Sequence, residues 1–180
     1  MKNFEHKVAV ITGASGGLGR AFADQALSRN MRLVLGDVRN DALQATLAEL
    51  KAQGAEAVAL AGDVSKPEYV AALAELAQSA FGAAHLVFNN AGVGAGGLVW
   101  ENTLKDWEWV INVNLWGVIH GVRTFTPMML ESAKQDPSYE GHIINVSSVA
   151  GLIAPHLLGA YNVTKHAVVA LSESLYHDLA

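Results

Sequence analysis

The chain of 180 residues contains no cysteine, only 4 prolines and few charged side chains. The absence of cysteine excludes disulfide bonds and thiolate metal sites. Charged residues make up 16% and hydrophobic residues 51%, a balance that excludes an intrinsically disordered segment. No window of about 20 residues is free of charged or strongly polar side chains, so no membrane-spanning helix is expected. The net charge of −5 argues against nucleic acid or an anionic membrane as the main partner.

The sequence also predicts neither a targeting segment nor a metal site. The N-terminus has no long apolar run before the first predicted strand, which predicts no secretory signal and a cytoplasmic location. The 7 histidines show no paired spacing suited to zinc, so no metal site is predicted. The length and the lack of a linker or repeat predict one domain over residues 1–180.

Short apolar segments alternate with segments of helical periodicity along the whole chain. The predicted strands are 8–12, 32–36, 57–61, 85–88 and 142–146. The predicted helices are 18–30, 41–53, a helix capped by Ser65 that runs to about 81, 103–131 and 159–180. Pro67 suits the first turn of the third helix, and Pro127 is expected to bend or break the fourth. Five such repeats predict an α/β fold, a doubly wound, Rossmann-like parallel sheet with strand order 3-2-1-4-5.

A polar or glycine-rich cluster follows each predicted strand. The clusters are Thr12-Gly13, Asp37, Asp63, Asn89-Asn90 and Ser148. The carboxyl ends of parallel strands share one edge of the sheet, where ligands bind at the point at which the strand order reverses. The sequence therefore predicts one ligand site assembled from all five strand ends.

The first cluster is a glycine-rich loop between a strand and a helix. Glycine lets the backbone approach a pyrophosphate closely, and a helix N-terminus offers free N–H groups and a positive dipole end. Glycine-rich turns are also common in ordinary loops. The position of this loop, after a strand and before a helix, is what favours a phosphate-binding role. The candidate cofactor-binding residues here are Thr12, Gly13, Ser15, Gly16, Gly17, Leu18 and Gly19.

Asp37 ends the second predicted strand, where a carboxylate can accept hydrogen bonds from an adenosine ribose. A carboxylate here would repel a 2′-phosphate, which favours NAD over NADP as the cofactor. Arg39 complicates this preference, because an arginine nearby can accommodate that phosphate. The alternative is that Asp37 only starts a turn with Asn40-Asp41.

The third and fourth strand ends each allow two interpretations. Asp63 and Val64 either contact adenine or form a turn before the next helix. Asn90, Ala91 and Gly92 either line the cofactor or brace their turn through side-chain hydrogen bonds, and both can hold together.

Tyr161 and Lys165 are four residues apart, which places them on one face of a helix. An ammonium beside a phenol favours the phenolate, which suits proton transfer near neutral pH. Ser148 lies before them in the chain and could hold the oxygen whose proton moves. Taken alone, the pair is more typical of a solvated helix face than of a site.

Together these motifs resemble the classical branch of the short-chain dehydrogenase/reductase family over nearly the whole chain. The spacing Thr-Gly-x-x-x-Gly-x-Gly at positions 12–19 and the motif Asn89-Asn90-Ala91-Gly92 are similar to those of the family. The residues that resemble its catalytic tetrad are Asn114, Ser148, Tyr161 and Lys165. The resemblance implies an enzyme that interconverts a secondary alcohol and a ketone by hydride transfer with NAD or NADP.

The resemblance also implies a role for each member of the tetrad. Tyr161 would be the general acid or base, and Lys165 would lower its pKa and bind the nicotinamide ribose. Ser148 would orient the substrate oxygen, and Asn114 would hold a water that links Lys165 to solvent. Ser147 is not expected to replace Ser148, because strand alternation points it to the other side.

Family members are usually longer than this chain, so the resemblance implies further strands and a substrate lid beyond Ala180. The alternative function is therefore a catalytically weak or inactive nucleotide-binding module. A dehydratase or epimerase using the same tyrosine is disfavoured by the glycine spacing. Apolar residues in the loop 152–158 favour a hydrophobic small-molecule substrate. The apolar circumference of the last helix, together with the resemblance, favours a homodimer or homotetramer.

Overall fold

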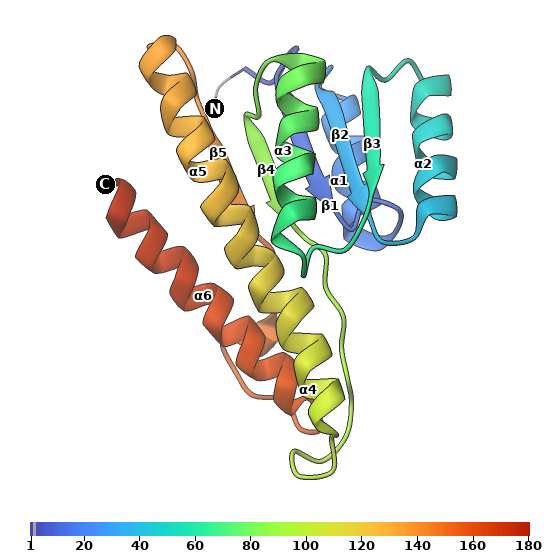
Figure 1. Ribbon diagram of the computed structural model, residues 1–180, viewed down its shortest axis with the longest axis vertical. Helices are drawn as coiled ribbons and strands as arrows, with labels where there is room; N and C mark the ends of the chain where they lie inside the picture. Colours follow the sequence, from blue (N-terminus) through green and yellow to red (C-terminus); the bar gives the residue numbers. More distant parts are fainter. Residues whose placement is uncertain (2) are drawn as a thin grey trace.

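The computed structural model describes residue 1 and residues 3–180. Five parallel strands form one sheet in the order β3-β2-β1-β4-β5 (Figure 1). Their bounds are β1 Val8–Thr12, β2 Arg32–Asp37, β3 Ala57–Ala61, β4 Leu86–Asn89 and β5 His142–Asn145. The predicted strand order and doubly wound α/β fold are confirmed.

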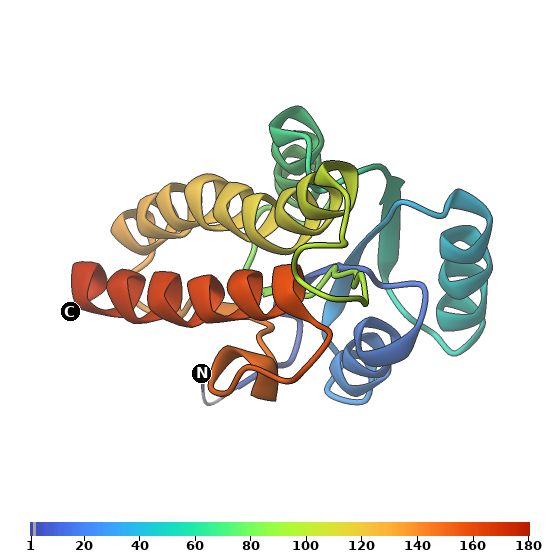
Figure 2. The same ribbon diagram turned by 90° about the horizontal axis from the view of Figure 1, so that it is seen from below.

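Helices cover both faces of the sheet (Figure 2). Their bounds are α1 Gly17–Leu27, α2 Asn40–Ala52, α3 Pro67–Phe81, α4 Leu104–Ile111, α5 Gly117–Gln135 and α6 Gly159–Leu179. Alternate strand residues serve opposite faces: Val10 belongs to the core with α3 and α5, whereas Ile11 belongs to the core with α1 and α2. Among the described residues, no helix combines the length and hydropathy that crossing a bilayer requires.

The long helix predicted over 103–131 is divided, but not at Pro127. Thr103 caps α4 by accepting a hydrogen bond from the Asp106 amide, and the Asp106 carboxylate accepts one from the Thr103 amide. The helix then opens into a π turn over Asn112–Trp116 before α5 begins. α5 continues through Pro127, so the prediction of a break there was wrong, and the alternative of a bend stays a prediction. Pro127 and Arg123, four residues earlier, are exposed, so water can bond the carbonyl that proline leaves free.

The predicted cap at Ser65 was also wrong. α3 begins one residue later than a Ser65 cap requires, with Lys66 in the capping position and no side-chain cap. The Ser65 amide instead donates to the Asp63 carboxylate, at 2.9 Å. An aspartate two residues before a backbone N–H forms its own turn, and that turn takes the place of the serine cap.

The carboxyl ends of the strands, α4 and the first turns of α6 lie toward the same end of the molecule (Figure 1). The loops that follow β1, β2, β3, β4 and β5 therefore meet there, as the sequence predicts. The opposite end of the sheet is closed by His85, whose Nδ1 accepts a hydrogen bond from the Val8 amide at 3.1 Å. The His85 ring also lies against the Tyr139 ring, with centroids 5.0 Å apart.

The acceptor role of His85 requires a neutral ring, and this makes stability depend on pH. Burial, with a smaller effect of Lys7, lowers the pKa of His85 to about 4. Between about pH 6.5 and 4 the unfolded chain binds this proton and the folded chain does not, so the free energy of unfolding falls as the pH falls. We expect a slope that is a fraction of about 1.4 kcal/mol per pH unit, because the ring is only half-buried.

Urea unfolding of the chain and of His85→Gln between pH 6.5 and 4 measures this contribution. The variant should lose stability less steeply with falling pH, and the exposed His156→Gln should keep the original slope. Parallel curves for His85→Gln and the unchanged chain would contradict the role of the neutral ring.

Candidate functional site

A cleft of about 950 Å³ runs along the carboxyl edge of the sheet. Its walls come from the loops after β1, β2, β3, β4 and β5, from the region around the π turn and from the start of α6. The predicted cofactor-binding residues that line it are Gly13, Gly16, Gly17, Leu18, Asp37, Asp63, Val64, Asn90, Ala91, Gly92, Tyr161 and Lys165. The structure therefore brings most of the predicted set into one continuous space.

The glycine-rich loop forms one wall of this cleft. Gly13 and Gly17 have φ values of +67° and +52°, a left-handed conformation that favours glycine. A Cβ on Gly19 would lie 2.0 Å from the Gly13 carbonyl oxygen, so only glycine permits this close packing. Gly16 precedes α1 without a side-chain cap, which leaves the amides of the first turn available. These features fit the pyrophosphate of a dinucleotide.

Thr12 and Asn90 hold the start of the glycine-rich loop in place. The Thr12 hydroxyl donates to the Phe88 carbonyl and accepts from the Asn90 and Ala91 amides. The Asn90 side chain donates to the Thr12 carbonyl at 2.8 Å. The bracing interpretation of Asn90 is thus observed, and its backbone also lines the cleft. Thr12 does not line the cleft, and it acts by holding β1 and β4 together.

Asp37 is buried beneath the cleft, with 5% of its surface exposed. Its carboxylate accepts hydrogen bonds from the Ser15 amide and hydroxyl and from the Arg39 amide and Nε. Burial alone would raise the pKa of Asp37, but the hydrogen bonds from Ser15 and Arg39 outweigh it and lower the pKa. Asp37 is therefore an anion at neutral pH, placed beside the glycine-rich loop.

The loop after β3 forms the neighbouring wall. The Asp63 carboxylate accepts from the Ser65 amide, so the turn interpretation of Asp63 is observed. Val64 packs under the start of α5, since a Cβ on Gly117 would lie 2.8 Å from Val64 Cγ2. This contact fixes the distance between the loop and the helix.

Lys165 and Tyr161 line another part of the cleft, on one face of α6. The Lys165 ammonium lies 5.5 Å from the centroid of the Tyr161 ring and donates to the Val146 carbonyl at 2.8 Å. Lys165 is only 4% exposed, and burial lowers its pKa. A buried ammonium with one protein acceptor has donors left for a ligand in the cleft.

The two serines after β5 have different partners. The Ser147 hydroxyl donates to the Lys165 carbonyl at 2.9 Å and so ties β5 to α6. The Ser148 hydroxyl accepts from the Ala150 amide at 3.2 Å, which leaves its own proton free to donate. Ser147 lines the cleft and Ser148 does not, although Ser148 follows it directly.

Asn114 is fully buried in the π turn. Its side chain accepts from the Val93 amide and donates to the Val93 carbonyl, both at 2.8 Å, and to Thr164 Oγ1 at 3.3 Å. A Cβ on Gly92 would lie 3.5 Å from Asn114 Oδ1 and 3.8 Å from Lys165 Nζ. Asn114 therefore joins the loop after β4 to α6, close to Lys165.

The predicted residues that do not line the cleft are Thr12, Ser15, Gly19, Asn114 and Ser148. The first four support residues that do line it. Sequence reasoning missed other lining residues: Val38, Gly62, Ser65, Lys66, Val93, Gly94, Trp109, Asn112, Val113, Val146 and Ser147. Most of these are immediate chain neighbours of predicted residues, so extending each motif by two positions would have found them. Trp109 is the exception, because it lies five residues before the nearest predicted residue, Asn114.

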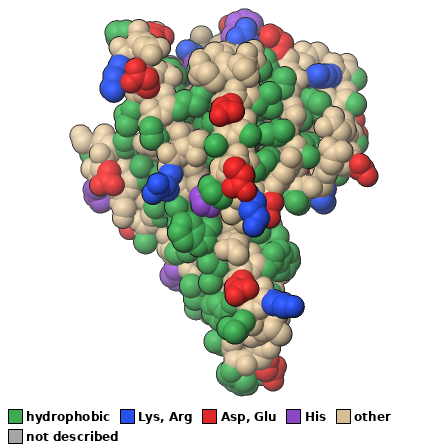
Figure 3. All heavy atoms as spheres, in the orientation of Figure 1, with side chains coloured by type: hydrophobic (Ala, Val, Ile, Leu, Met, Phe, Trp, Pro, Cys, Tyr) green, Lys and Arg blue, Asp and Glu red, His purple; other side chains and the backbone are tan. Residues whose placement is uncertain are grey.

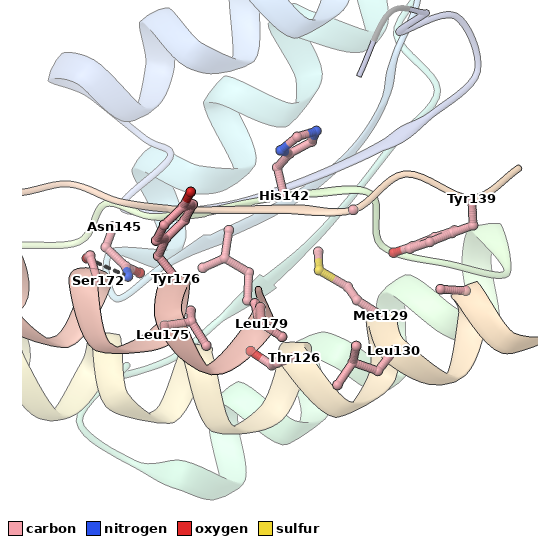
Figure 4. A pocket seen from close by; sticks show the side chains of 13 residues that line it. Thr126, Met129, Leu130, Tyr139, His142, Asn145, Ser172, Leu175, Tyr176 and Leu179 are labelled. Carbon is pink, nitrogen blue, oxygen red and sulfur yellow. Dashed lines mark hydrogen bonds between the residues drawn. The ribbon is translucent and has the colours of Figure 1, made fainter. Parts of the chain in front are cut away.

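A second cavity of about 360 Å³ lies away from these residues, between β5 and the C-terminal parts of α5 and α6 (Figure 4). Its walls are mainly apolar and include Met129, Leu175 and Leu179. β5 is an edge strand of the described sheet, as the sequence predicts. No predicted site residue lines this cavity, so the chemistry is placed in the cleft at the carboxyl edge.

Comparisons with known proteins identify the family of the chain. A family model described as short chain dehydrogenase matches residues 7–180. SadH of Mycobacterium tuberculosis is 40% identical over 179 residues, which are 99% of this chain and 63% of SadH. The cyclohexanol dehydrogenase of an Acinetobacter strain is 35% identical over 172 residues, 95% of this chain and 66% of that enzyme.

A solved structure of a short-chain dehydrogenase/reductase from Burkholderia phymatum in complex with NAD has the same fold. Its TM-score is 0.95 at 53% sequence identity, covering 99% of this chain and 62% of that chain. A doubly wound sheet with a glycine-lined cleft thus defines the class, and the chain belongs to the short-chain dehydrogenase/reductase family. It spans 63% of the length of SadH. The prediction of further strands beyond Ala180 stays a prediction.

Proposed function

We propose that the protein interconverts a secondary alcohol and a ketone, with NAD or NADP bound along the cleft. One observation carries the proposal: the cleft joins a phosphate-fitting glycine loop to Tyr161 and the buried Lys165. A dinucleotide carries a pyrophosphate and a reactive nicotinamide ring, and these two groups of residues suit one part each. Family membership and the dehydrogenase names of relatives support the same reaction class.

The bound nicotinamide would supply the hydride acceptor or donor, and the residues of the chain would handle the proton. In alcohol oxidation the carbon-bound hydrogen leaves as hydride, and Tyr161 Oη accepts the hydroxyl proton. Lys165 would bind the nicotinamide ribose and hold positive charge near the phenol. The Ser148 hydroxyl would donate to the substrate oxygen. Asn114 would keep the loop after β4 in place and hold the water that connects Lys165 to solvent.

The substrate in this proposal is a hydrophobic small molecule. The loops on either side of Tyr161 are tied together, because the Gly97 amide donates to the Leu157 carbonyl at 2.9 Å. Exposed apolar side chains lie on both loops: Val99, Trp100, Leu152, Ile153 and Leu157. Hydrophobic side chains also gather toward the same end of the molecule in Figure 3. Such a rim favours an apolar alcohol or ketone over a sugar.

The proposal includes a homodimer or homotetramer and a cytoplasmic location. Exposed apolar side chains on the outer helices support self-association: Trp116, Leu130, Val163 and Tyr176. The absence of cysteine is compatible with a reducing compartment.

The Asp37 carboxylate supports a preference for NAD over NADP. A 2′-phosphate at the adenosine ribose would approach this buried anion, whereas a free 2′-hydroxyl could donate to it. Arg39 is 63% exposed at its side chain and lies beside Gly16, so it offers partial compensation. We expect NAD to bind at least about tenfold more tightly than NADP.

Calorimetric titration of both dinucleotides tests this preference. Asp37→Ser should bring the two dissociation constants closer, mainly by strengthening NADP. Arg39→Gln should weaken NADP further and change NAD little. Tighter NADP than NAD binding by the unchanged chain would overturn the assignment of Asp37.

The proposed reaction is tested by supplying the chain with NAD and a panel of hydrophobic secondary alcohols and following formation of the reduced cofactor. Turnover that grows with the apolar size of the alcohol supports the proposal. Tight NAD binding without turnover of any alcohol or ketone would instead favour the alternative of a nucleotide-binding module.

A further inference from the structure

Trp109 lies in the wall of the cleft and has no role in the reaction proposed above. It is 49% exposed, although α4 packs against α6. Among the described residues, Trp116 has a ring partner in His120, with centroids 5.6 Å apart, whereas no ring stacks on Trp109. An indole face is therefore available to a ligand in the cleft.

The helix phase shows which end of the cleft Trp109 faces. Trp107 points to the start of α6, because a Cβ on Gly159 would lie 3.8 Å from Trp107 Cζ2. Two residues correspond to about 200° around a helix, so Trp109 points nearly the opposite way. It faces away from the start of α6. Gly117, further along the same helical stripe, packs on Val64 in the loop after β3.

The same helix face continues along that loop. Asn112 and Val113, one turn after Trp109, also line the cleft. Further on, Gly117 packs on Val64. The helix is therefore fixed to the loop after β3, and Trp109 stands at the open side of this contact.

This end of the cleft is the adenosine end if the proposed function holds. Asp37 and Val38 form one wall of it, and Asp63 and Val64 form another. Adenine is a flat aromatic base, and base–aromatic contacts stabilise binding without requiring hydrogen bonds. We infer that Trp109 packs against the adenine base and is a cofactor-binding residue of this protein. This inference rests on the proposed function, because it requires a dinucleotide in the cleft.

Calorimetry with NAD, AMP and nicotinamide mononucleotide separates the two ends of the cofactor. For Trp109→Ala we expect dissociation constants for NAD and AMP about tenfold higher than those of the unchanged chain. Binding of nicotinamide mononucleotide, which lacks adenine, should not change. Trp109→Phe should recover most of the affinity, and Trp116→Ala, in the π turn that follows α4 and outside the cleft, should match the unchanged chain.

Three results would overturn the inference. Equal NAD affinity of Trp109→Ala and the unchanged chain would rule out the contact between Trp109 and adenine but leave the proposed function intact. Weaker binding of nicotinamide mononucleotide with unchanged binding of AMP would place the indole at the nicotinamide end of the cofactor. Failure of the unchanged chain to bind any of the three ligands contradicts both the inference and the proposed function.

Discussion

Replacing Tyr161 by phenylalanine is expected to lower the rate of alcohol oxidation by about 10²- to 10⁴-fold. The substitution removes a single oxygen, the atom to which the proton transfer is assigned. The ring remains beside Gly94 and Lys165, so the shape of the cleft is retained. NAD affinity should therefore stay within about twofold, since the phenol oxygen is not needed to hold the dinucleotide.

The matched control is Tyr176→Phe, which removes the same atom near the other end of α6. Tyr176 is exposed and lines the apolar cavity beside β5, not the cleft. Steady-state rates and NAD titrations for both variants form the test. A nucleotide-binding module would respond equally to the two substitutions, and such a result would contradict the catalytic assignment.

Replacing Lys165 by methionine is expected to lower the same rate by about 10²-fold or more and to weaken NAD binding. Methionine keeps the unbranched stem in the buried site but supplies neither positive charge nor donors. The Tyr161 phenol and the nicotinamide ribose would both lose their proposed contact with the Lys165 ammonium. The effect on NAD distinguishes this variant from Tyr161→Phe, in which only the rate should fall.

The same variant should change how stability depends on pH. Burial lowers the pKa of Lys165 below its usual value of 10.5. Between the lowered value and 10.5 the unfolded chain binds the proton and the folded chain does not, so the free energy of unfolding rises with pH. Lys165→Met should lack this rise. Urea unfolding across alkaline pH measures it, and identical pH profiles for the two proteins would show that the ammonium is not desolvated.

The sheet and most of the cleft could be predicted from the sequence because they depend on local patterns. A β-branched run such as 8–12 followed by glycines defines both a strand and the loop after it. Parallel strands then bring their ends to one edge whatever the details of the helices. This is why Gly13, Asp37 and Lys165, far apart in the chain, were predicted to share one site.

The features that sequence reasoning missed depend on tertiary contacts. Asn114 turns its side chain to Val93 and Thr164, within a π turn that no periodicity of the sequence indicates. The phase of α4 relative to the cleft, and with it the position of Trp109, could not be read from the residues alone. Pro127 was overestimated as a helix breaker because its exposure was unknown.

The most direct test of the proposed reaction is transfer of deuterium from the alcohol carbon to the cofactor. The chain is incubated with NAD and hydrophobic secondary alcohols deuterated at the carbinol carbon, and the reduced nicotinamide is analysed by mass spectrometry. The proposed reaction predicts one deuterium in the reduced cofactor with the unchanged chain and with Tyr176→Phe, and almost none with Tyr161→Phe. Bound NAD that never acquires the label, or label transfer unaffected by Tyr161→Phe, would contradict it.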